Sequence, residues 1–416
     1  MTETRASDAE DEAPEPSPAE GPDAPEKTLP RARPWAWIWR PLGIFAASRV
    51  VTVVAAVVAA TIAEELGDDL STDKPWPPPS PTRYLTLRAL GSWDGGWYAR
   101  IAEQGYPQDT GDPEPWADFA FFPLFPAAVR VVSRVLGVTT TVAGITLSIL
   151  LGAVAVSLLW LLARDLGGTA MADRAVALFS FFPGSIVLSM AYAESMMLTF
   201  ALACLLALFA RRWELAGLAA GLATATRPNA IALCFCCAWA AALAVRRRRE
   251  WRALAAPALS VTGIMAYFLF LQRRTGELFF WFDVQSRTWN EKVDFGVGTW
   301  HRLQNALADP LDVHQPRDIN SLVATLGLLF VVFALYALWR WRPPAVLTIY
   351  AVVVILLAVM SQTLGLRPRF VLTAFPLLLA LASWLRGVAF HVFLGWSAGL
   401  LGVFMIISVA TLYATP

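Results

Sequence analysis

Long apolar stretches recur along almost the whole chain, and they constrain the fold more than any other feature. A helix needs about 20 mostly apolar residues to cross a bilayer, because the hydrocarbon core is about 30 Å thick. The chain contains 57% hydrophobic but only 16% charged residues, whereas soluble domains carry about 25% charged residues. We therefore predict an all-α polytopic membrane protein with about eleven spans. The candidates are residues 42–63, 140–163, 173–190, 195–211, 214–226, 229–245, 253–272, 320–340, 344–361, 370–386 and 390–413.

Two of these candidates, 214–226 and 229–245, are short and flank Arg227 and Pro228. They are consistent with a single broken helix pair. Backbone groups that such a break leaves unpaired are tolerated in a membrane only inside protein or beside a wet cavity.

The N-terminal segment 1–34 differs in composition from the rest. It is rich in Pro, Glu, Asp and Ala and has few large apolar side chains. Such a segment cannot bury enough surface to offset its ordering entropy, so we expect a disordered cytoplasmic tail before a transmembrane domain at 35–416. The net charge of +1 gives no reason to expect nucleic acid as a partner.

Arginines mark every second connection between the predicted spans. Short loops rich in Arg or Lys face the cytoplasm, so we predict a multi-pass cell-membrane protein with a cytoplasmic N-terminus. The remaining connections then lie outside, and the two long ones are 64–139 and 273–319. The arginines on the cytoplasmic side are Arg31, Arg33, Arg40, Arg164, Arg174, Arg211, Arg212, Arg246 to Arg249, Arg252, Arg340, Arg342 and Arg386.

Both long outer loops are rich in aromatic residues. Tryptophan and tyrosine favour the headgroup layer, so we predict interfacial helices against the membrane surface. The aromatic residues are Trp76, Trp93, Trp97, Tyr98, Tyr106, Trp116, Phe119, Phe121, Phe122 and Phe125 in the first loop, and Phe279 to Phe282, Trp289 and Trp300 in the second.

The segment 93–98 of the first loop reads Trp-Asp-Gly-Gly-Trp-Tyr. Asp94 is suited to capping the helix that follows, and the two glycines leave space for an approach to the backbone. A carboxylate ringed by aromatic groups at a membrane surface is also suited to general base catalysis. The residues alone leave both interpretations open.

Several other ionisable residues are predicted to lie on the outer side. Arg227, Arg367 and Arg369 depart from the positive-inside trend, and phosphate is a natural ligand for a guanidinium group. Ordinary lipid phosphates or helix C-termini explain them equally well. Glu194 is expected to pair with one of these arginines. Glu103 is either a further polar contact in a site or part of a solvated helix face.

Three common catalytic patterns are missing from the sequence. It has no Walker A loop, no HExxH and no GxSxG, and His301, His314 and His391 are widely scattered. A transporter or lipid flippase without transferase activity is the alternative function. It would place ionisable groups along a path near the bilayer midplane. Arg49 is the main such residue, and we expect its side chain to snorkel to the helix end. A catalytically inactive membrane scaffold also stays open.

Three motifs in the first outer loop carry a family resemblance. Segment 92–98 reads Ser-Trp-Asp-Gly-Gly-Trp-Tyr, 101–106 reads Ile-Ala-Glu-Gln-Gly-Tyr, and 121–126 reads Phe-Phe-Pro-Leu-Phe-Pro. In this order the chain resembles the class V glycosylphosphatidylinositol mannosyltransferases, and it looks like one of their bacterial relatives. Thr-Arg-Pro-Asn at 226–229 and Pro-Arg-Phe at 368–370 also look like patterns of that family.

The resemblance implies a GT-C glycosyltransferase that transfers mannose from a polyprenyl-phosphate donor and has a catalytic acid in the first outer loop. Asp94 matches that position, which favours the role of general base in an inverting transfer at the outer face. The acceptor is a glycan, a glycolipid or a protein hydroxyl. Many GT-C enzymes show paired acidic residues, and only one carboxylate stands in this motif, so no cofactor is predicted and a divalent metal is left open. The expected substrate contacts are Trp93, Tyr98, Glu103, Tyr106, Glu194, Arg227, Asn229, Arg367 and Arg369.

Overall fold

The computed structural model describes residues 36–65, 84–108, 115–308, 316–362 and 365–410. The described residues from Ile38 onward form one compact unit. In the described ranges the regular secondary structure is helical, apart from one isolated β-bridge between Val293 and Ser361. The predicted N-terminal tail and Trp76 lie outside the described residues.

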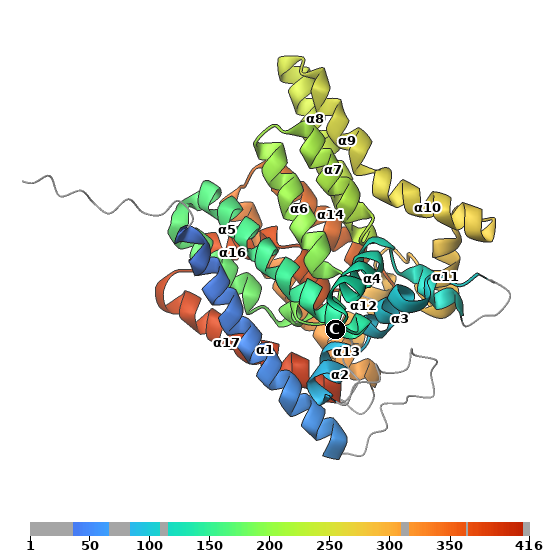
Figure 1. Ribbon diagram of the computed structural model, residues 1–416. Coiled ribbons are helices and arrows are strands. Elements are labelled where there is room, and N and C mark those ends of the chain that lie inside the picture. The colour runs from blue at the N-terminus through green and yellow to red at the C-terminus, as the bar shows by residue number, and fades with distance from the viewer. Residues whose placement is uncertain (1–35, 66–83, 109–114, 309–315, 363–364, 411–416) are drawn as a thin grey trace, which may run out of the picture. The chain divides into compact units, whose positions relative to one another are not determined.

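The helices of the described ranges follow in chain order, with η for 3-10 helices (Figure 1). They are η1 Ala36–Ile38, α1 Trp39–Glu65, α2 Leu85–Leu90, α3 Asp94–Gln104, η2 Pro115–Ala120, α4 Leu124–Leu136, α5 Thr140–Ser180, η3 Pro183–Leu188, α6 Glu194–Phe209, α7 Trp213–Thr224, η4 Pro228–Ile231, α8 Ala232–Arg248, η5 Trp251–Leu254, α9 Ala255–Ser260, α10 Thr262–Thr275, α11 Phe280–Thr288, α12 Val297–Ala308, α13 Pro316–Trp341, α14 Ala345–Val359, α15 Pro368–Thr373, α16 Pro376–Trp384 and α17 Gly387–Ala410.

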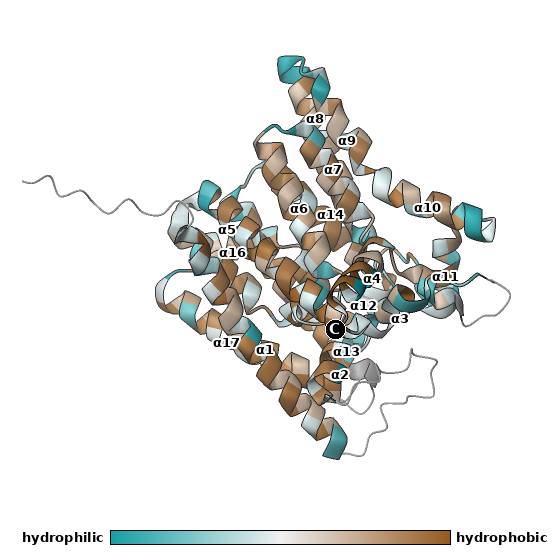
Figure 2. Ribbon diagram, in the orientation of Figure 1, coloured by the Kyte–Doolittle hydropathy of each residue, from teal (hydrophilic) through white to brown (hydrophobic). Residues whose placement is uncertain are grey.

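Long apolar helices make up most of this unit, as Figure 2 shows by the brown helices. Within the described residues, 6 helical stretches are long and apolar enough to cross a membrane. Two shorter apolar helices, α6 and α14, accompany them. The predicted all-α polytopic membrane fold is confirmed. The six stretches are Trp39–Glu65, Thr140–Ser180, Pro228–Arg248, Trp251–Thr275, Ile319–Trp341 and Gly387–Ala410.

The stretch 173–190, predicted as one span, is not a continuous helix. Helix α5 contains a kink at Gly167 and Gly168, where Gly168 has a φ of +79°. The helix then ends at Ser180, and the chain continues into η3. Hydropathy cannot detect this change, because the residues on both sides of the break are apolar.

The predicted break near Arg227 is confirmed. Helix α7 ends at Thr224, and η4 leads into α8. Close packing against α9 and α10 holds this region, because a Cβ on Gly263 would lie 2.0 Å from the carbonyl oxygen of Gly221. Small residues at such contacts let membrane helices approach closely.

Arg49 in α1 is buried, with 7% of its surface exposed. Its guanidinium donates to the carbonyl oxygens of Ser180 (2.8 Å) and Ser185 (2.6 Å) and to the hydroxyl of Ser189 (3.0 Å). The expectation that Arg49 snorkels is therefore wrong, since its charge is satisfied by the irregular chain around η3. These contacts fix the path of the chain between α5 and α6.

Candidate active site

Asp94 is the first residue of α3, and its position depends on strained backbone just before it. Trp93 has a φ of +57°, which is unfavourable for a bulky residue, and its indole nitrogen donates to the carbonyl oxygen of Ser408 in α17 (2.9 Å). Trp93 is the N-cap, and no side chain caps the helix there. The interpretation of Asp94 as the capping residue is therefore wrong. Its carboxylate is directed elsewhere.

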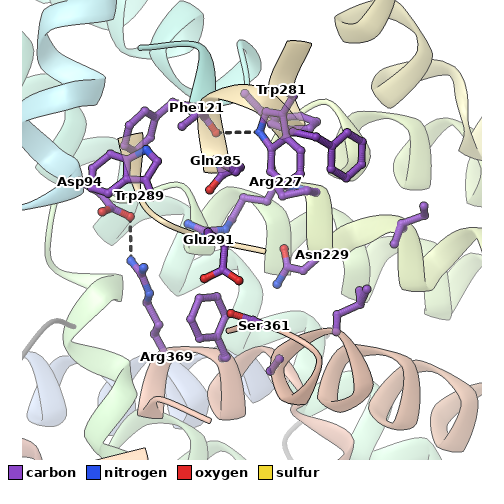
Figure 3. A pocket seen from close by; sticks show the side chains of 18 of the residues that line it. Asp94, Phe121, Arg227, Asn229, Trp281, Gln285, Trp289, Glu291, Ser361 and Arg369 are labelled. Atoms are coloured by element: carbon purple, nitrogen blue, oxygen red, sulfur yellow. Dashed lines mark hydrogen bonds and ion pairs between the residues drawn. The ribbon is translucent and has the colours of Figure 1, made fainter. Parts of the chain in front are cut away.

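The partner of Asp94 is Arg369. The guanidinium Nη1 of Arg369 lies 2.7 Å from Oδ2 of Asp94, with the two side chains 8% and 19% exposed, and Figure 3 shows the contact. Tyr192 lies under both groups: its hydroxyl accepts from the backbone N–H of Asp94 (3.3 Å), and its ring lies 5.8 Å from the guanidinium carbon. The carboxylate and the guanidinium are thus held together before any ligand is present.

Two glycine contacts explain how α3 and α15 reach this point. A Cβ on Gly95 would lie 3.3 Å from the Cβ of Ala191, so this glycine admits a neighbouring chain segment. A Cβ on Gly184 in η3 would lie 2.2 Å from the carbonyl oxygen of Pro368. The N-terminus of α15, which carries Arg369, therefore packs against η3 only because position 184 has no side chain.

Glu194 and Arg227 form a second ion pair. The pairing predicted for Glu194 is present, with 2.8 Å between its Oε1 and Nη1 of Arg227 and exposures of 1% and 11%. The two groups are not aligned for a hydrogen bond, and in the described part of the chain neither Glu194 oxygen has a hydrogen-bond partner. A buried carboxylate without hydrogen bonds depends on the arginine for its compensation.

Both ion pairs border a single cavity of about 710 Å³, within the usual range for small-molecule sites. Asp94, Arg367 and Arg369 mark its polar part. Much of the remaining wall is aromatic and aliphatic, with side chains from η4, α10 and α14. These apolar lining residues include Ile231, Ile264, Phe268, Val354, Leu357 and Ala358.

Six of the other predicted contacts line the cavity or belong to its ion pairs, but two do not. Trp93, Tyr98, Arg227, Asn229 and Arg367 are lining residues, whereas Glu194 reaches it through Arg227. Glu103 is exposed and accepts from the hydroxyl of Thr140 (2.6 Å) at the start of α5. The Tyr106 hydroxyl donates to the carbonyl oxygen of Phe121 (2.6 Å). The structure gives no support for substrate contacts by Glu103 or Tyr106.

The connection between α10 and α13, predicted as the second outer loop, contributes residues that the sequence did not indicate for the site. Gln285, Trp289 and Glu291 line the cavity together with Ser361 (Figure 3). The aromatic content of this loop was the only available signal, and we interpreted it as membrane anchoring. Trp289 instead packs edge-on against Trp97 of α3, with ring centroids 5.8 Å apart.

The charged residues around Arg367 affect its pKa. Burial lowers the pKa of Arg367 to about 9, and the positive charges of Arg369 and Arg302 act in the same direction. The carboxylates of Asp94 and Glu291 act in the opposite direction and raise the pKa. A ligand with negative charge would favour the cationic form of this arginine for the same reason.

The residues that the structure describes contain no group of three or more His, Cys, Asp or Glu side chains suited to holding a metal ion. Two carboxylates at the cavity, Asp94 and Glu194, are each paired with an arginine, and Glu291 is a third carboxylate in its wall. The chemistry that its own side chains supply is proton transfer at a carboxylate and binding of an anion.

A comparison with protein families identifies the relatives of this chain. Residues 81–281 match the family described as mannosyltransferase (PIG-V). This part of the chain is similar to the PIG-V mannosyltransferase family. The match includes Asp94, Glu194 and Arg227 but ends before Glu291 and Arg369. The resemblance predicted from the three sequence motifs is confirmed, and a search of curated proteins found no match.

Two solved structures are similar to this chain over most of its length. The crystal structure of ArnT from Cupriavidus metallidurans bound to undecaprenyl phosphate has 15% identity and a TM-score of 0.49, covering 92% of this chain and 77% of its own. The oligosaccharyltransferase of Archaeoglobus fulgidus in its apo form has 15% identity and a TM-score of 0.44. That comparison covers 86% of this chain and 56% of the oligosaccharyltransferase, so this chain spans little more than half of that protein's length.

Proposed function

We propose that this protein transfers a mannosyl residue from a polyprenyl-phosphate carrier to an acceptor hydroxyl at the non-cytoplasmic face of the membrane. The observation that carries the proposal is one cavity that contains the Asp94–Arg369 pair and that is also lined by many apolar side chains, among them residues of α10 and α14. A lipid-linked sugar phosphate likewise has a polar and an apolar part. Its phosphate and sugar are polar, and its chain remains in an apolar environment.

Asp94 serves as the general base in this mechanism. It removes the proton of the acceptor hydroxyl while that oxygen forms a bond to the anomeric carbon of the sugar. The bond between the anomeric carbon and the phosphate oxygen breaks on the opposite face. The product sugar therefore has inverted configuration, and the polyprenyl phosphate leaves with the electron pair of the broken bond.

The arginines stabilise the leaving phosphate. Arg369 is held in place by Asp94 and Tyr192, and Arg367 lines the same part of the cavity. Donors placed in advance where charge develops lower the barrier without reorganisation at the moment of reaction. Embedding the cavity among membrane helices also limits access of water to the sugar phosphate.

The transporter alternative depends on ionisable groups along a path through the membrane. The buried charge at Arg49 is bound by the chain around η3. The other charged groups described above gather in the cavity or near helix ends. This arrangement favours a transferase over a transporter.

The test is Asp94→Asn in the full chain reconstituted with a radiolabelled polyprenyl-phosphate mannose and a panel of acceptors. We expect transfer to fall by about a hundredfold to ten-thousandfold, while binding of the donor is largely retained. Glu103→Gln, a change on the same helix but outside the cavity, serves as the matched control and keeps its activity. Near-normal turnover by Asp94→Asn would overturn the role of this residue.

A further inference from the structure

A carboxylate from the second outer loop, Glu291, enters the cavity that holds Asp94. Figure 3 shows Glu291 in the middle of the view, near Arg227 and Ser361, with Gln285 and Trp289 from the same loop nearby. The mechanism above uses none of these loop residues. They lie outside residues 81–281, the segment that matches the PIG-V family.

The position of Glu291 is set by the end of α11. Asn290 has a φ of +50°, and the backbone N–H of Glu291 donates to the carbonyl oxygen of Gln285 (2.9 Å). A residue in the left-handed region followed by such a bond ends a helix in a fixed geometry. Gln285 and Glu291 are thereby brought next to each other at the end of α11.

The turn that carries the arginines holds the same loop from the other side. Oε1 of Glu291 accepts from the backbone N–H of Gln362 (2.9 Å), and the carbonyl oxygen of Lys292 accepts from that N–H as well (3.0 Å). The guanidinium of Arg302 also donates to the carbonyl oxygen of Gln362 (2.7 Å). Glu291 is thus fixed close to the turn that leads to Arg367, where the donor phosphate binds in the proposed function.

Two tryptophans attach the loop to the first outer loop. The indole nitrogen of Trp281 donates to the carbonyl oxygen of Ala120 (3.2 Å). Trp289 packs edge-on against Trp97 and Phe121, with centroids 5.8 Å and 6.2 Å apart. The wall of the cavity therefore combines a rigid aromatic surface with a carboxylate and an amide, which are groups that hydrogen-bond hydroxyls.

We infer that Glu291, Gln285 and Trp289 form the subsite for the transferred hexose, with Glu291 accepting hydrogen bonds from its hydroxyl groups. The inference rests on the proposed function. The sugar is bonded directly to the phosphate, so its hydroxyls lie within a few ångströms of the arginines. Glu291 is the specificity-determining residue of this subsite, and Asp94 remains the group that takes the proton.

The experiment compares kcat/KM of the wild-type chain and of Glu291→Gln. Each is measured with the complete lipid-linked donor and with donors that each lack one sugar hydroxyl. With the complete donor, we expect kcat/KM to fall by about ten- to a hundredfold, because a charged hydrogen bond is weakened. With the donor that lacks the hydroxyl bound by Glu291, the substitution causes little further loss. Gln285→Ala is expected to reduce kcat/KM in the same direction.

A structural role of Glu291 predicts a different pattern. If Glu291 only ties the loop to Gln362, then the substitution lowers activity by the same factor with every deoxy donor. Asp294→Asn is the matched control for loop integrity, because Asp294 accepts from the backbone N–H groups of Gly296 and Gly298 and does not line the cavity. We expect its effect to be the same with each donor.

The outcomes distinguish failure of the inference from failure of the proposed function. Equal losses of kcat/KM with all deoxy donors overturn the inference. It is also overturned if the loss caused by Glu291→Gln depends only on the removal of an acceptor hydroxyl. In both cases, transfer by the wild-type chain upholds the proposed function. Absence of transfer from any lipid-linked hexose by the wild-type chain overturns both.

Discussion

At the scale of single residues, two ion pairs lie at the cavity. Asp94 and Arg369 are 275 positions apart in the sequence, yet their side chains are 2.7 Å apart. Glu194 and Arg227 form the second pair. Such pairing keeps buried charges compensated while no substrate is bound, and it fixes the guanidinium groups where an anion is to bind.

The buried pair of Glu194 and Arg227 gives a prediction about stability. Arg227→Gln leaves an uncompensated carboxylate that is only 1% exposed, so the substitution is expected to destabilise the protein by about 3–5 kcal/mol. The loss appears as a lower thermal midpoint of the purified protein in detergent.

The double variant Glu194→Gln/Arg227→Gln separates charge from packing. It removes both charges together and is expected to recover most of the lost midpoint. If the double variant is as unstable as the sum of the single variants, then the two residues do not act as a pair.

The sequence allowed Asp94, Arg227 and Arg369 to be predicted as site residues, because arginines and a carboxylate on the outer side require a chemical reason. It did not allow Glu291 to be predicted, since its position depends on the left-handed backbone at Asn290. Of the two interpretations of Glu103, its exposed position fits the solvated helix face and not a contact in the cavity. This residue stands in a motif on α3, but the periodicity of the helix turns it toward Thr140 and away from the cavity.

At the scale of secondary structure elements, the contact between η3 and α15 decides where Arg369 lies. Gly184 is the residue that permits the contact, since its missing side chain leaves room for Pro368. Hydropathy predicted the apolar character of both segments. It could not predict the irregular chain between α5 and α6, because the register between the segments depends on one small residue.

Substitution of this glycine gives a prediction at the same scale. In Gly184→Ala the new Cβ would lie 2.2 Å from the carbonyl oxygen of Pro368 and 2.7 Å from the backbone nitrogen of Arg369, so α15 has to move. We expect kcat to fall at least tenfold, because displacement of positioned groups by about 1 Å costs as much as a hundredfold.

The control for this change is Gly399→Ala in α17. No atom lies within 4 Å of the added Cβ there, so activity should be unchanged. Full activity of Gly184→Ala, measured with the same donor and acceptor, would show that the contact does not position Arg369.

At the scale of the whole transmembrane unit, contacts join connections that the arginine pattern assigns to the same side. Glu250 pairs with Arg211 and accepts from the indole of Trp213, and Arg40 pairs with Asp173. These residues all belong to connections predicted as cytoplasmic. Described residues of the two long connections predicted as outer, and of the turn before α15, line the cavity together.

Labelling with a membrane-impermeant maleimide tests the proposed topology. In a chain whose four native cysteines are replaced, Glu277→Cys in the second outer loop is expected to react in intact cells. Arg249→Cys, among the arginines at the end of α8, is expected to react only after permeabilisation. Reaction of both positions in intact cells would contradict the assignment.

The contacts of Trp93 and Arg49 also connect the site to both the first and the last long helix of the described chain. Trp93 is held by the carbonyl oxygen of Ser408, close to the end of the described chain, and Arg49 in the first helix holds the segment on which α15 rests. We therefore expect Asp94 and Arg369 to be fully positioned only when both α1 and α17 have been inserted. A chain that is released before α17 is synthesised would then have an incompletely positioned site and would not act on its substrate.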